Sequence, residues 1–379
     1  MANIRTAIPA ILLGFFVMGF VDVVGISTSY VKADFDLPDA LASMLPMAVF
    51  LWFFVFSIPT GLLMNKWGKK QVVSASMAVT AVAMVVPMVT YSFATMMVSF
   101  AMLGIGNTML QVSLNPLAAS TVRQEMQASI LTWGQFIKAI SSFLGPILAG
   151  AAAFYTGEWR MIFAIYAVMT LISLVYVWFS TKGDKEPVAA AGFGSTLKLF
   201  GDAYIVRLFV GILVIVGIDV GLNTVIPKLL VEKTGIELSQ AGLGTSLYFV
   251  ARTAGAFVGA IALAKCNAQH IMRVTMVVAI AAMVVLMTVG EQWVLWAAIA
   301  VAGMMYANVF SIIFAYALQH RPEQTNQVSS LMIMGVSGGA LFAPIMGLIA
   351  DNSTQAISLC VVLLGTMYLL LFISNKRKV

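Results

Sequence analysis

Charged side chains are scarce in this sequence. Asp, Glu, Lys and Arg make up only 9% of the 379 residues, whereas apolar residues make up 61%. Soluble domains usually carry about 25% charged residues. A soluble chain of this length could not shield so large an apolar fraction from water, so the solvent around most of the chain must be lipid. The scarcity of charge therefore predicts an integral membrane protein.

Cysteine, histidine and phosphate-binding motifs are also scarce or absent. The two cysteines, Cys266 and Cys360, lie far apart in the sequence, which predicts neither a disulfide nor a metal site. The two histidines, His270 and His320, form no catalytic pair with either cysteine. The sequence has no Walker-type phosphate loop and no soluble segment long enough for an enzyme. We therefore expect neither ATP-driven transport nor an enzyme, and no cofactor.

The apolar residues occur in long runs. These runs are continuous rather than alternating at every second residue, so they predict helices, about twelve in number. The first run has no small-residue cleavage site, which predicts a span rather than a removed signal peptide. No span carries a filter sequence or a ring of charge, which argues against a channel. The predicted spans are 7–32, 40–64, 70–90, 93–119, 127–155, 160–180, 204–231, 240–264, 270–290, 292–318, 326–350 and 354–374.

Lysine and arginine are distributed unevenly between the predicted loops. If the N-terminus lies inside, most of the basic residues fall in the inner loops. The outer loops and span ends then hold only Lys32, Arg160, Lys228 and Lys233. This asymmetry predicts that both termini are cytoplasmic, in the inner (cytoplasmic) membrane of a bacterium. It also accounts for the net charge of +6, which therefore requires no nucleic-acid partner.

A polar connection divides the chain. Residues 181–203 separate a predicted N-terminal six-helix bundle, 1–180, from a predicted C-terminal one, 204–379. The segment FVDVVG resembles GIDVGL and so places Asp22 and Asp219 at matching positions, and FLGPILAG resembles LFAPIMGL at nearly the same offset. The repetition predicts two pseudo-symmetric bundles with a site between them, near the middle of the membrane.

Several motifs resemble those of the major facilitator superfamily. The segment GLLMNKWGKK, residues 61–70, is similar to its loop motif Gly-x-Leu-x-Asp-Arg-x-Gly-Arg-Lys, with Asn65 in place of the usual Asp. This replacement implies a weaker lock on the outward-open state. LQVSLNPLAAS (110–120) and SSLMIMGVSGGALFAPIMGLIAD (329–351) are similar to the fourth and eleventh spans of the fucose/glucose–galactose proton symporter branch. The loop positions that we expect to act in the conformational change are Gly61, Asn65, Gly68, Lys69 and Lys70.

The resemblance implies the major facilitator fold and import of a sugar by proton symport through alternating access. Asp22 matches the acid that fucose members carry on the first span. On the fourth span Gln111 stands where fucose members have Glu, as it does in glucose-type members, and Gln cannot carry a proton. On the fifth span Gln135 matches a sugar-contacting Gln, whereas Lys138 replaces an Asn. This last departure is the largest, and it bears on whether the sugar is neutral.

Four ionisable side chains fall deep inside predicted spans: Asp22, Lys138, Asp219 and Arg252. Each would cost about 2.5 to 3.5 kcal/mol if it faced lipid, so we expect them to face a wet cavity or one another. Asp22 is the predicted proton carrier, and Asp219 is either a second proton site or the partner of a base. Lys138 and Arg252 are predicted to form internal ion pairs or to bind the substrate, where Arg252 suits a carboxylate.

Neutral polar residues are predicted to complete the site. Amides bind sugar hydroxyls, and aromatic rings cover the apolar faces of sugars. Asn115 precedes Pro116, so it also has a predicted role in bending its helix. Trp133, Tyr248 and Phe310 are further candidate aromatic platforms. The predicted substrate-binding residues are Gln111, Asn115, Gln135, Lys138, Asn223, Arg252, Tyr306 and Asn308.

The sequence thus predicts an all-α membrane transporter that works as a monomer and uses the proton gradient as its energy source. Its predicted partners are a sugar or sugar derivative, the proton and the lipid bilayer. Three alternatives remain open at this stage. They are a proton-coupled carrier of organic anions such as sugar acids, a proton-antiport exporter, and a sensor that keeps the fold without transporting.

Overall fold

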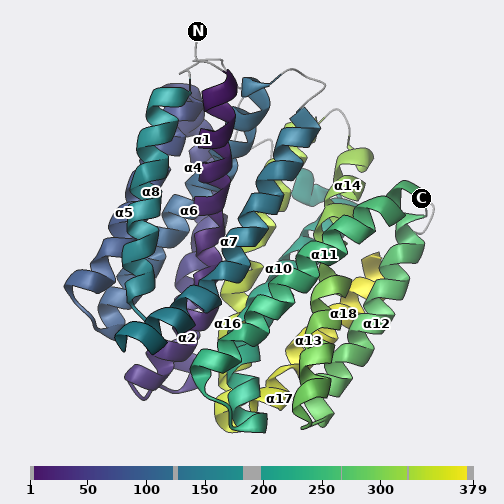
Figure 1. Cartoon of the computed structure of the whole chain (residues 1–379). Coiled ribbons are helices and arrows are strands. Elements are labelled where there is room, and N and C mark those ends of the chain that lie inside the picture. Colours follow the sequence, from purple (N-terminus) through teal and green to yellow (C-terminus); the bar gives the residue numbers. More distant parts are fainter. Residues whose placement is uncertain (1–3, 123–126, 182–197, 266, 322–323, 374–379) are drawn as a thin grey trace.

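The computed structural model describes residues 4–122, 127–181, 198–265, 267–321 and 324–373. These residues form helices joined by short turns, and none of them lies in a strand (Figure 1). Ten helical stretches among them are long and apolar enough to cross a membrane. A shorter apolar stretch follows at Gln355–Leu371, and α11 (Leu238–Lys265) is also a long helix. The predicted all-α membrane fold of about twelve helices is confirmed.

The first half of the chain contains two interrupted spans and four continuous ones. In the first span, a short 3-10 turn, η1, separates two α-helices. The elements are α1 (Ile4–Met18), η1 (Gly19–Asp22), α2 (Val23–Asp34), α3 (Asp39–Ala42), α4 (Met44–Trp67), α5 (Lys69–Val89), α6 (Phe93–Thr121), α7 (Gln127–Thr156) and α8 (Met161–Ser180).

The described part of the second half is also helical. Its last three predicted spans are each divided into shorter elements. Most of the predicted linker, 181–203, lies outside the described residues. The elements are η3 (Leu199–Gly201), α10 (Ala203–Thr234), α11 (Leu238–Lys265), α12 (Ala268–Thr288), α13 (Gln292–Tyr306), α14 (Val309–His320), α15 (Thr325–Met334), η5 (Gly335–Gly338), α16 (Gly339–Asn352), α17 (Gln355–Ser358), α18 (Cys360–Tyr368) and η6 (Leu369–Ile373).

Local sequence fixes the ends of several helices. Gly68 joins α4 to α5 at φ +90°, a conformation that a side chain would strain. Ser92 begins α6 with a capping box, because its side chain and that of Thr95 each accept the other's backbone N–H. The Asp202 carboxylate caps the start of α10 by accepting the N–H groups of Tyr204 and Ile205.

Asp202 lies just before the seventh span and also pairs with basic residues at the end of α14. Arg321 lies 2.6 Å from its Oδ2, and His320 lies 3.0 Å from the same atom. Burial works to raise the pKa of this carboxyl. The hydrogen bonds from Arg321, His320 and the start of α10 outweigh burial and hold the pKa at about 2. Asp202 is therefore ionised at any physiological pH and ties α10 to α14.

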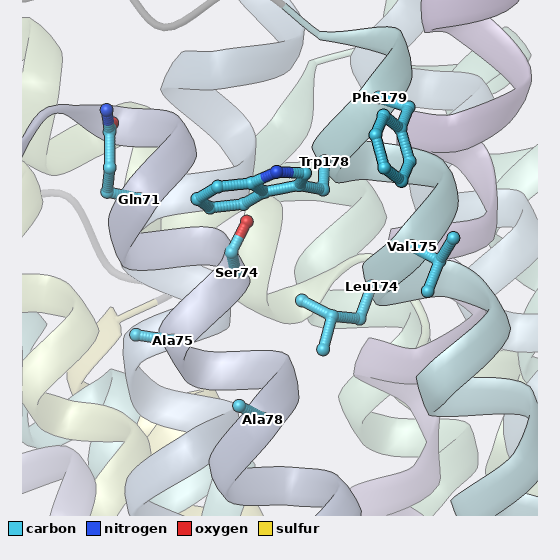
Figure 2. A pocket seen from close by; sticks show the side chains of 8 residues that line it. All are labelled: Gln71, Ser74, Ala75, Ala78, Leu174, Val175, Trp178 and Phe179. Atoms are coloured by element: carbon cyan, nitrogen blue, oxygen red, sulfur yellow. The ribbon is translucent and has the colours of Figure 1, made fainter.

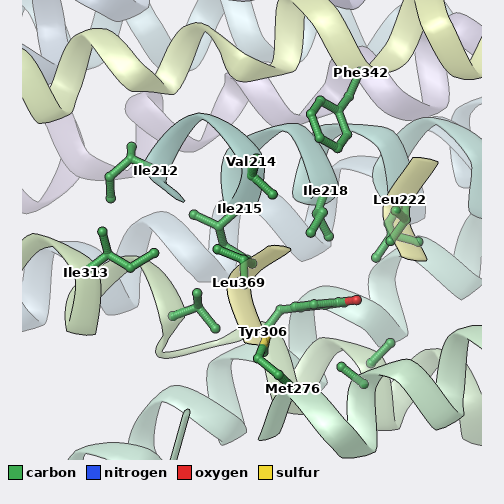
Figure 3. Packing of buried hydrophobic residues seen from close by; sticks show 14 of the residues in the cluster. Ile212, Val214, Ile215, Ile218, Leu222, Met276, Tyr306, Ile313, Phe342 and Leu369 are labelled. Atoms are coloured by element: carbon green, nitrogen blue, oxygen red, sulfur yellow. The ribbon is translucent and has the colours of Figure 1, made fainter. Parts of the chain in front are cut away.

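Each half has its own apolar core. In the second half, residues of α10 such as Ile212 and Ile218 pack against Met276, Ile313 and Leu369 from three other elements (Figure 3). The first half has a separate cluster built mainly from α1, α2, α4, α6 and α8, and this cluster also takes in four residues of the second half, Val220, Val336, Ala340 and Ala343. Most of these apolar side chains pack within one half, and some of them pack across the contact between the halves.

The two halves lie side by side at the end of the molecule where α2 and α17 are found, which we call the distal end (Figure 1). There α7 and α11 cross, and the Ser246 hydroxyl donates to the Phe143 carbonyl over 2.9 Å. A Cβ at Gly150 would lie 3.1 Å from the Ser239 carbonyl, so the small residue permits this approach. Toward the opposite end α7 and α11 diverge (Figure 1).

Candidate functional site

Asp22 ends the 3-10 turn that interrupts the first span. The turn rests directly on α7, since a Cβ at Gly19 would come within 2.6 Å of both the Lys138 carbonyl and the Ser141 side chain. Only glycine allows the backbones to approach so closely. The interruption also frees main-chain groups near the middle of the span, and these need other partners in lipid.

The Asp22 carboxylate is partly exposed and, within the described part of the chain, accepts from one hydroxyl. The Ser142 Oγ on α7 lies 2.5 Å from Asp22 Oδ2. The Asp22 carbonyl accepts from the Asn223 amide of α10, in the other half, over 2.9 Å. Asn223 also abuts Gly25, where a Cβ would collide with its side chain. Asp22 forms no ion pair with any residue that the structure describes.

Asp219 has a different environment. Its Oδ2 lies 2.6 Å from the Arg252 guanidinium of α11, and its Oδ1 accepts the Tyr248 hydroxyl over 2.6 Å. The Asp219 side chain is 11% exposed and that of Arg252 is 27% exposed. A buried carboxylate needs this compensation, since removing one partner would leave a bare charge. Asp219 and Arg252 thus form an ion pair within the second half.

Lys138 lies on α7, one turn before Ser142, and is partly exposed. The charges of Asp22, Asp219 and Arg252 all act on its ammonium group. It makes no hydrogen bond or ion pair with another residue in the described ranges. The structure therefore brings together the four charges predicted from the sequence. Two of them are paired, and the other two have no charged partner within hydrogen-bond reach among the residues that the structure describes.

The predicted amides of the fourth span support the break at Asp22. Asn107, which the sequence did not suggest, donates to the Met18 carbonyl at the start of the turn over 2.8 Å. Gln111 donates to the Asn107 side chain over 2.8 Å, and Asn115 donates to the Gln111 carbonyl over 3.1 Å. This chain of amides satisfies a carbonyl that the helix break would leave free. Its signal in the sequence was the i, i+4, i+8 spacing of 107, 111 and 115 on one helix face.

Two other predicted residues organise the second half. The Tyr306 ring is fully buried, and its hydroxyl lies 2.6 Å from that of Thr366. Asn308 lies where the tenth span is interrupted, and it donates to the Gly255 carbonyl of α11 over 2.8 Å. The structure thus does not place either residue beside Asp22. By contrast, Gln135 is exposed on α7, one turn before Lys138.

Comparison with known proteins now decides the family. The model of the Major Facilitator Superfamily matches residues 10–344. The chain belongs to the major facilitator superfamily. The predicted resemblance is confirmed, and the superfamily's members and the relatives below are transporters rather than enzymes.

Two relatives and one solved structure represent the similarity. The chain is 22% identical over 366 residues to a glucose/galactose transporter of Brucella abortus, covering 92% of this chain and 89% of the relative. It is 24% identical over 360 residues to a probable nitrate transporter of Staphylococcus haemolyticus, covering 91% and 89%. The structure of the Escherichia coli fucose:proton symporter aligns with a TM-score of 0.69 at 14% identity, covering 99% and 100%. This last likeness shows the fold.

The superfamily loop motif joins α4 to α5. The Lys70 ammonium donates to the Thr181 carbonyl at the end of α8 over 2.8 Å and lies 5.2 Å from the centre of the Trp178 ring. A cation suits the carbonyl end of a helix. Lys69 is buried, and Gly61 has open space around its Cα. The Asn65 side chain lies outside the described residues, so its predicted effect remains a prediction.

A cluster of charges at the distal end was not predicted as a unit. Asp39 of α3 accepts from Lys32 over 2.6 Å, and from Lys228 and Gln355 of the second half over 2.7 and 2.6 Å. Asp351 of α16 accepts the N–H groups of Asp39 and Ala40 over 2.5 and 2.7 Å. We call Lys32, Asp39, Lys228, Asp351 and Gln355 the distal network. Sequence reasoning placed Lys32 and Lys228 near the outer surface but had no means of finding their shared partner.

A groove of about 490 Å³ lies away from these charges, between α5 and α8 (Figure 2). Ala75, Ala78, Leu174, Val175 and Phe179 make most of its lining apolar. Both helices belong to the first half, so the groove is not part of the contact between the halves. We therefore take the charged cluster around Asp22 as the candidate functional site.

Proposed function

We propose that this transporter imports a sugar or sugar derivative together with a proton, by alternating access between its two halves. The observation that carries the proposal is the position of Asp22. Its carboxylate lies at the contact between the halves without an ion-pair partner in the described part of the chain, while its main chain is bonded to Asn223 of the other half.

The arrangement of charges favours Asp22 over Asp219 as the proton carrier. Moving an isolated carboxylate through an apolar passage is costly, and protonation removes that charge. Asp219 is already compensated by Arg252 and Tyr248, so protonation would break two bonds. The structure therefore favours the paired alternative for Asp219, in which its charge is fixed.

The sugar part of the proposal depends on the relatives and on the polar residues near Asp22. The Brucella abortus relative is named a glucose/galactose transporter. The exposed amide of Gln135 and the partly exposed Gln111 and Asn115 offer donors and acceptors to sugar hydroxyls. Trp133, exposed on the same turn of α7 as Gln135, offers an aromatic face.

The closed distal end supports alternating access. With both termini in the cytoplasm, as the positive-inside rule predicts, the distal network faces the periplasm. The described conformation is then closed to the outside, and import requires the network to open. The transporter would act as a monomer in the bacterial inner membrane, without a cofactor, driven by the proton gradient.

The proton carrier is tested in proteoliposomes with radiolabelled D-glucose. Asp22→Asn should abolish uphill uptake driven by a pH gradient, because the amide cannot carry a proton. Counterflow exchange of glucose should continue, because it requires no net proton movement. Asp219→Asn is the matched comparison. Uphill uptake by Asp22→Asn with normal pH dependence would exclude Asp22 as the carrier.

A second candidate function follows from Lys138. An ammonium group without an ion-pair partner among the described residues suits an anionic substrate, and one relative is a probable nitrate transporter. The protein would then carry a sugar acid. Thermal stabilisation by D-gluconate and by D-glucose, compared in wild type and Lys138→Gln, separates the two candidates. Stabilisation by gluconate alone, lost in the variant, would move the substrate to the organic anions.

A further inference from the structure

Ser142 has one hydroxyl proton and two acceptors within reach. Its Oγ lies 2.5 Å from Asp22 Oδ2 and 3.1 Å from the carbonyl oxygen of Lys138, one turn earlier on α7. A serine hydroxyl offers one donor and two acceptor lone pairs. The side chain is only 4% exposed, so water has little access to it. Ser142 can therefore donate fully to only one of these two oxygens at a time.

We propose that Ser142 is a positioning residue that transmits the protonation state of Asp22 to α7. The proposal rests on the proposed function, because it requires Asp22 to be the proton carrier. When Asp22 is ionised, the Ser142 hydroxyl donates to its carboxylate. When Asp22 takes up a proton from the aqueous phase, its new O–H donates to a lone pair of Ser142 Oγ, and the Ser142 proton turns to the Lys138 carbonyl. No covalent bond other than the new O–H changes.

The exchange alters two contacts at one place. The bond between Asp22 and Ser142 changes from charge-assisted to neutral, and charge-assisted bonds are roughly twice as strong. The Ser142 hydroxyl then donates fully to the Lys138 carbonyl. A serine that donates to the carbonyl four residues earlier bends its helix slightly. The backbone at Gly19 packs against the same carbonyl, since a Cβ at Gly19 would lie 2.6 Å from the Lys138 carbonyl oxygen. Protonation therefore acts where the first span rests on α7.

This location connects the proton to the contact between the halves. Residues of α7 further along the helix cross α11 of the second half, where Ser246 donates to the Phe143 carbonyl. Phe143 directly follows Ser142. A change in the bonding of Ser142 therefore occurs beside a carbonyl that joins α7 to the other half.

Other titratable groups, three of them charged, also face Asp22. They are Lys138 on α7, Tyr166 on α8, Asp219 on α10 and Arg252 on α11. All of them stay in place when Ser142 is replaced. A difference in the hydrogen bonding of the Asp22 carboxyl between wild type and a Ser142 variant is therefore due to the hydroxyl.

The test is pH-difference infrared spectroscopy of the purified protein in bilayers, with no substrate present. The carboxyl band of protonated Asp22 is assigned by its loss in Asp22→Asn. In the wild type the protonated carboxyl donates to Ser142 Oγ, so Ser142→Ala, which removes that acceptor, should shift the C=O stretching band of Asp22 to higher frequency. Ser142→Thr keeps the hydroxyl and should keep the wild-type band position.

Ser141→Ala is the matched control. Ser141 is the neighbouring residue and is equally buried, and its hydroxyl has no hydrogen-bond partner in the described structure. An unchanged band position in Ser142→Ala, or the same shift in Ser141→Ala, would overturn the role of Ser142 while leaving Asp22 as the carrier. If no Asp22 band titrates in the wild type, the proposed proton carrier fails as well.

Discussion

The two charged regions of this transporter differ in how completely their charges are compensated. In the distal network, Asp39 accepts from three side chains, and Asp351 accepts from two main-chain N–H groups. Near the middle of the membrane, Asp219 is paired with Arg252, whereas Asp22 and Lys138 lack a charged partner within bonding distance among the described residues. A compensated charge holds two elements together. An uncompensated one remains available to a proton or a substrate.

The two regions also differ in whether their bonds connect the two halves or lie within one of them. Except for the pair between Lys32 and Asp39, the bonds of the distal network join the two halves, so they exist only while that end is closed. The Asp219–Arg252 pair lies within one half and can persist through a rocking motion. Asp22 contacts both halves. Its main-chain carbonyl accepts from Asn223 of the second half, whereas its carboxylate accepts from Ser142 of its own half.

The largest effect is expected from breaking the distal network. The Asp39 and Lys228 side chains are 5% and 7% exposed, and removing one partner of such a buried pair typically costs about 3 to 5 kcal/mol. Asp39→Leu should therefore shift the protein strongly toward opening at the distal end. Spin labels at Asp36 and Ser353, in a cysteine-free background, would report the distance across that end.

The control for this prediction removes both charges. Asp39→Leu combined with Lys228→Met removes the buried ammonium that Asp39→Leu alone would leave without its partner, whereas the Lys32 side chain is 33% exposed and can be hydrated, so the double variant should recover much of the closed population. Equal distances in wild type and in Asp39→Leu would show that the distal network does not hold the closed state.

A smaller effect is expected at the mid-membrane pair. Arg252→Met leaves Asp219 with the Tyr248 hydroxyl as its remaining donor, and the partial exposure of Arg252 lets water offset some of the loss. We expect a loss of about 1 to 3 kcal/mol in the free energy of unfolding. Lys138→Met, which breaks no ion pair with a described residue, should leave the melting temperature nearly unchanged. Equal destabilisation by the two variants would contradict the distinction between paired and unpaired charges.

The smallest effect concerns the support of the helix break. Asn107→Ala removes the donor to the Met18 carbonyl, which should cost about 1 kcal/mol. Asn115→Ala removes a bond within α6 only and serves as the comparison. Thermal melting measures both. A larger loss from Asn115→Ala than from Asn107→Ala would show that the amide chain does not stabilise the turn at Asp22.

Sequence patterns predicted the fold well because they report hydrophobicity along the chain. The predicted spans agree with the helices to within a few residues, and the breaks were the main omission. Gly19–Asp22 continues an apolar run, so nothing in its composition marks a 3-10 turn. The turn forms because Gly19 lets α7 approach, a contact between residues more than a hundred positions apart.

The sequence predicted the charged residues of the candidate site, but it predicted the neutral residues only in part. Asp22, Lys138, Asp219 and Arg252 stand out because charge is rare in a membrane span. Tyr306 and Asn308 were also predicted to bind substrate, but they pack within the second half. An aromatic or amide side chain in a span can pack and form hydrogen bonds equally well against another helix. The residue type alone therefore does not show which way the side chain faces.

By itself, the sequence determined that this protein lies in a membrane, that it is built from about twelve helices, and that four charges lie deep among them. These properties depend on transfer from water to lipid, which acts on each segment separately. Only the tertiary structure decided which acid is ion-paired and which, among the described residues, accepts from a hydroxyl instead, and where Ser142 and Asn107 act. Those outcomes depend on distances of a few ångströms between helices that are far apart in the chain.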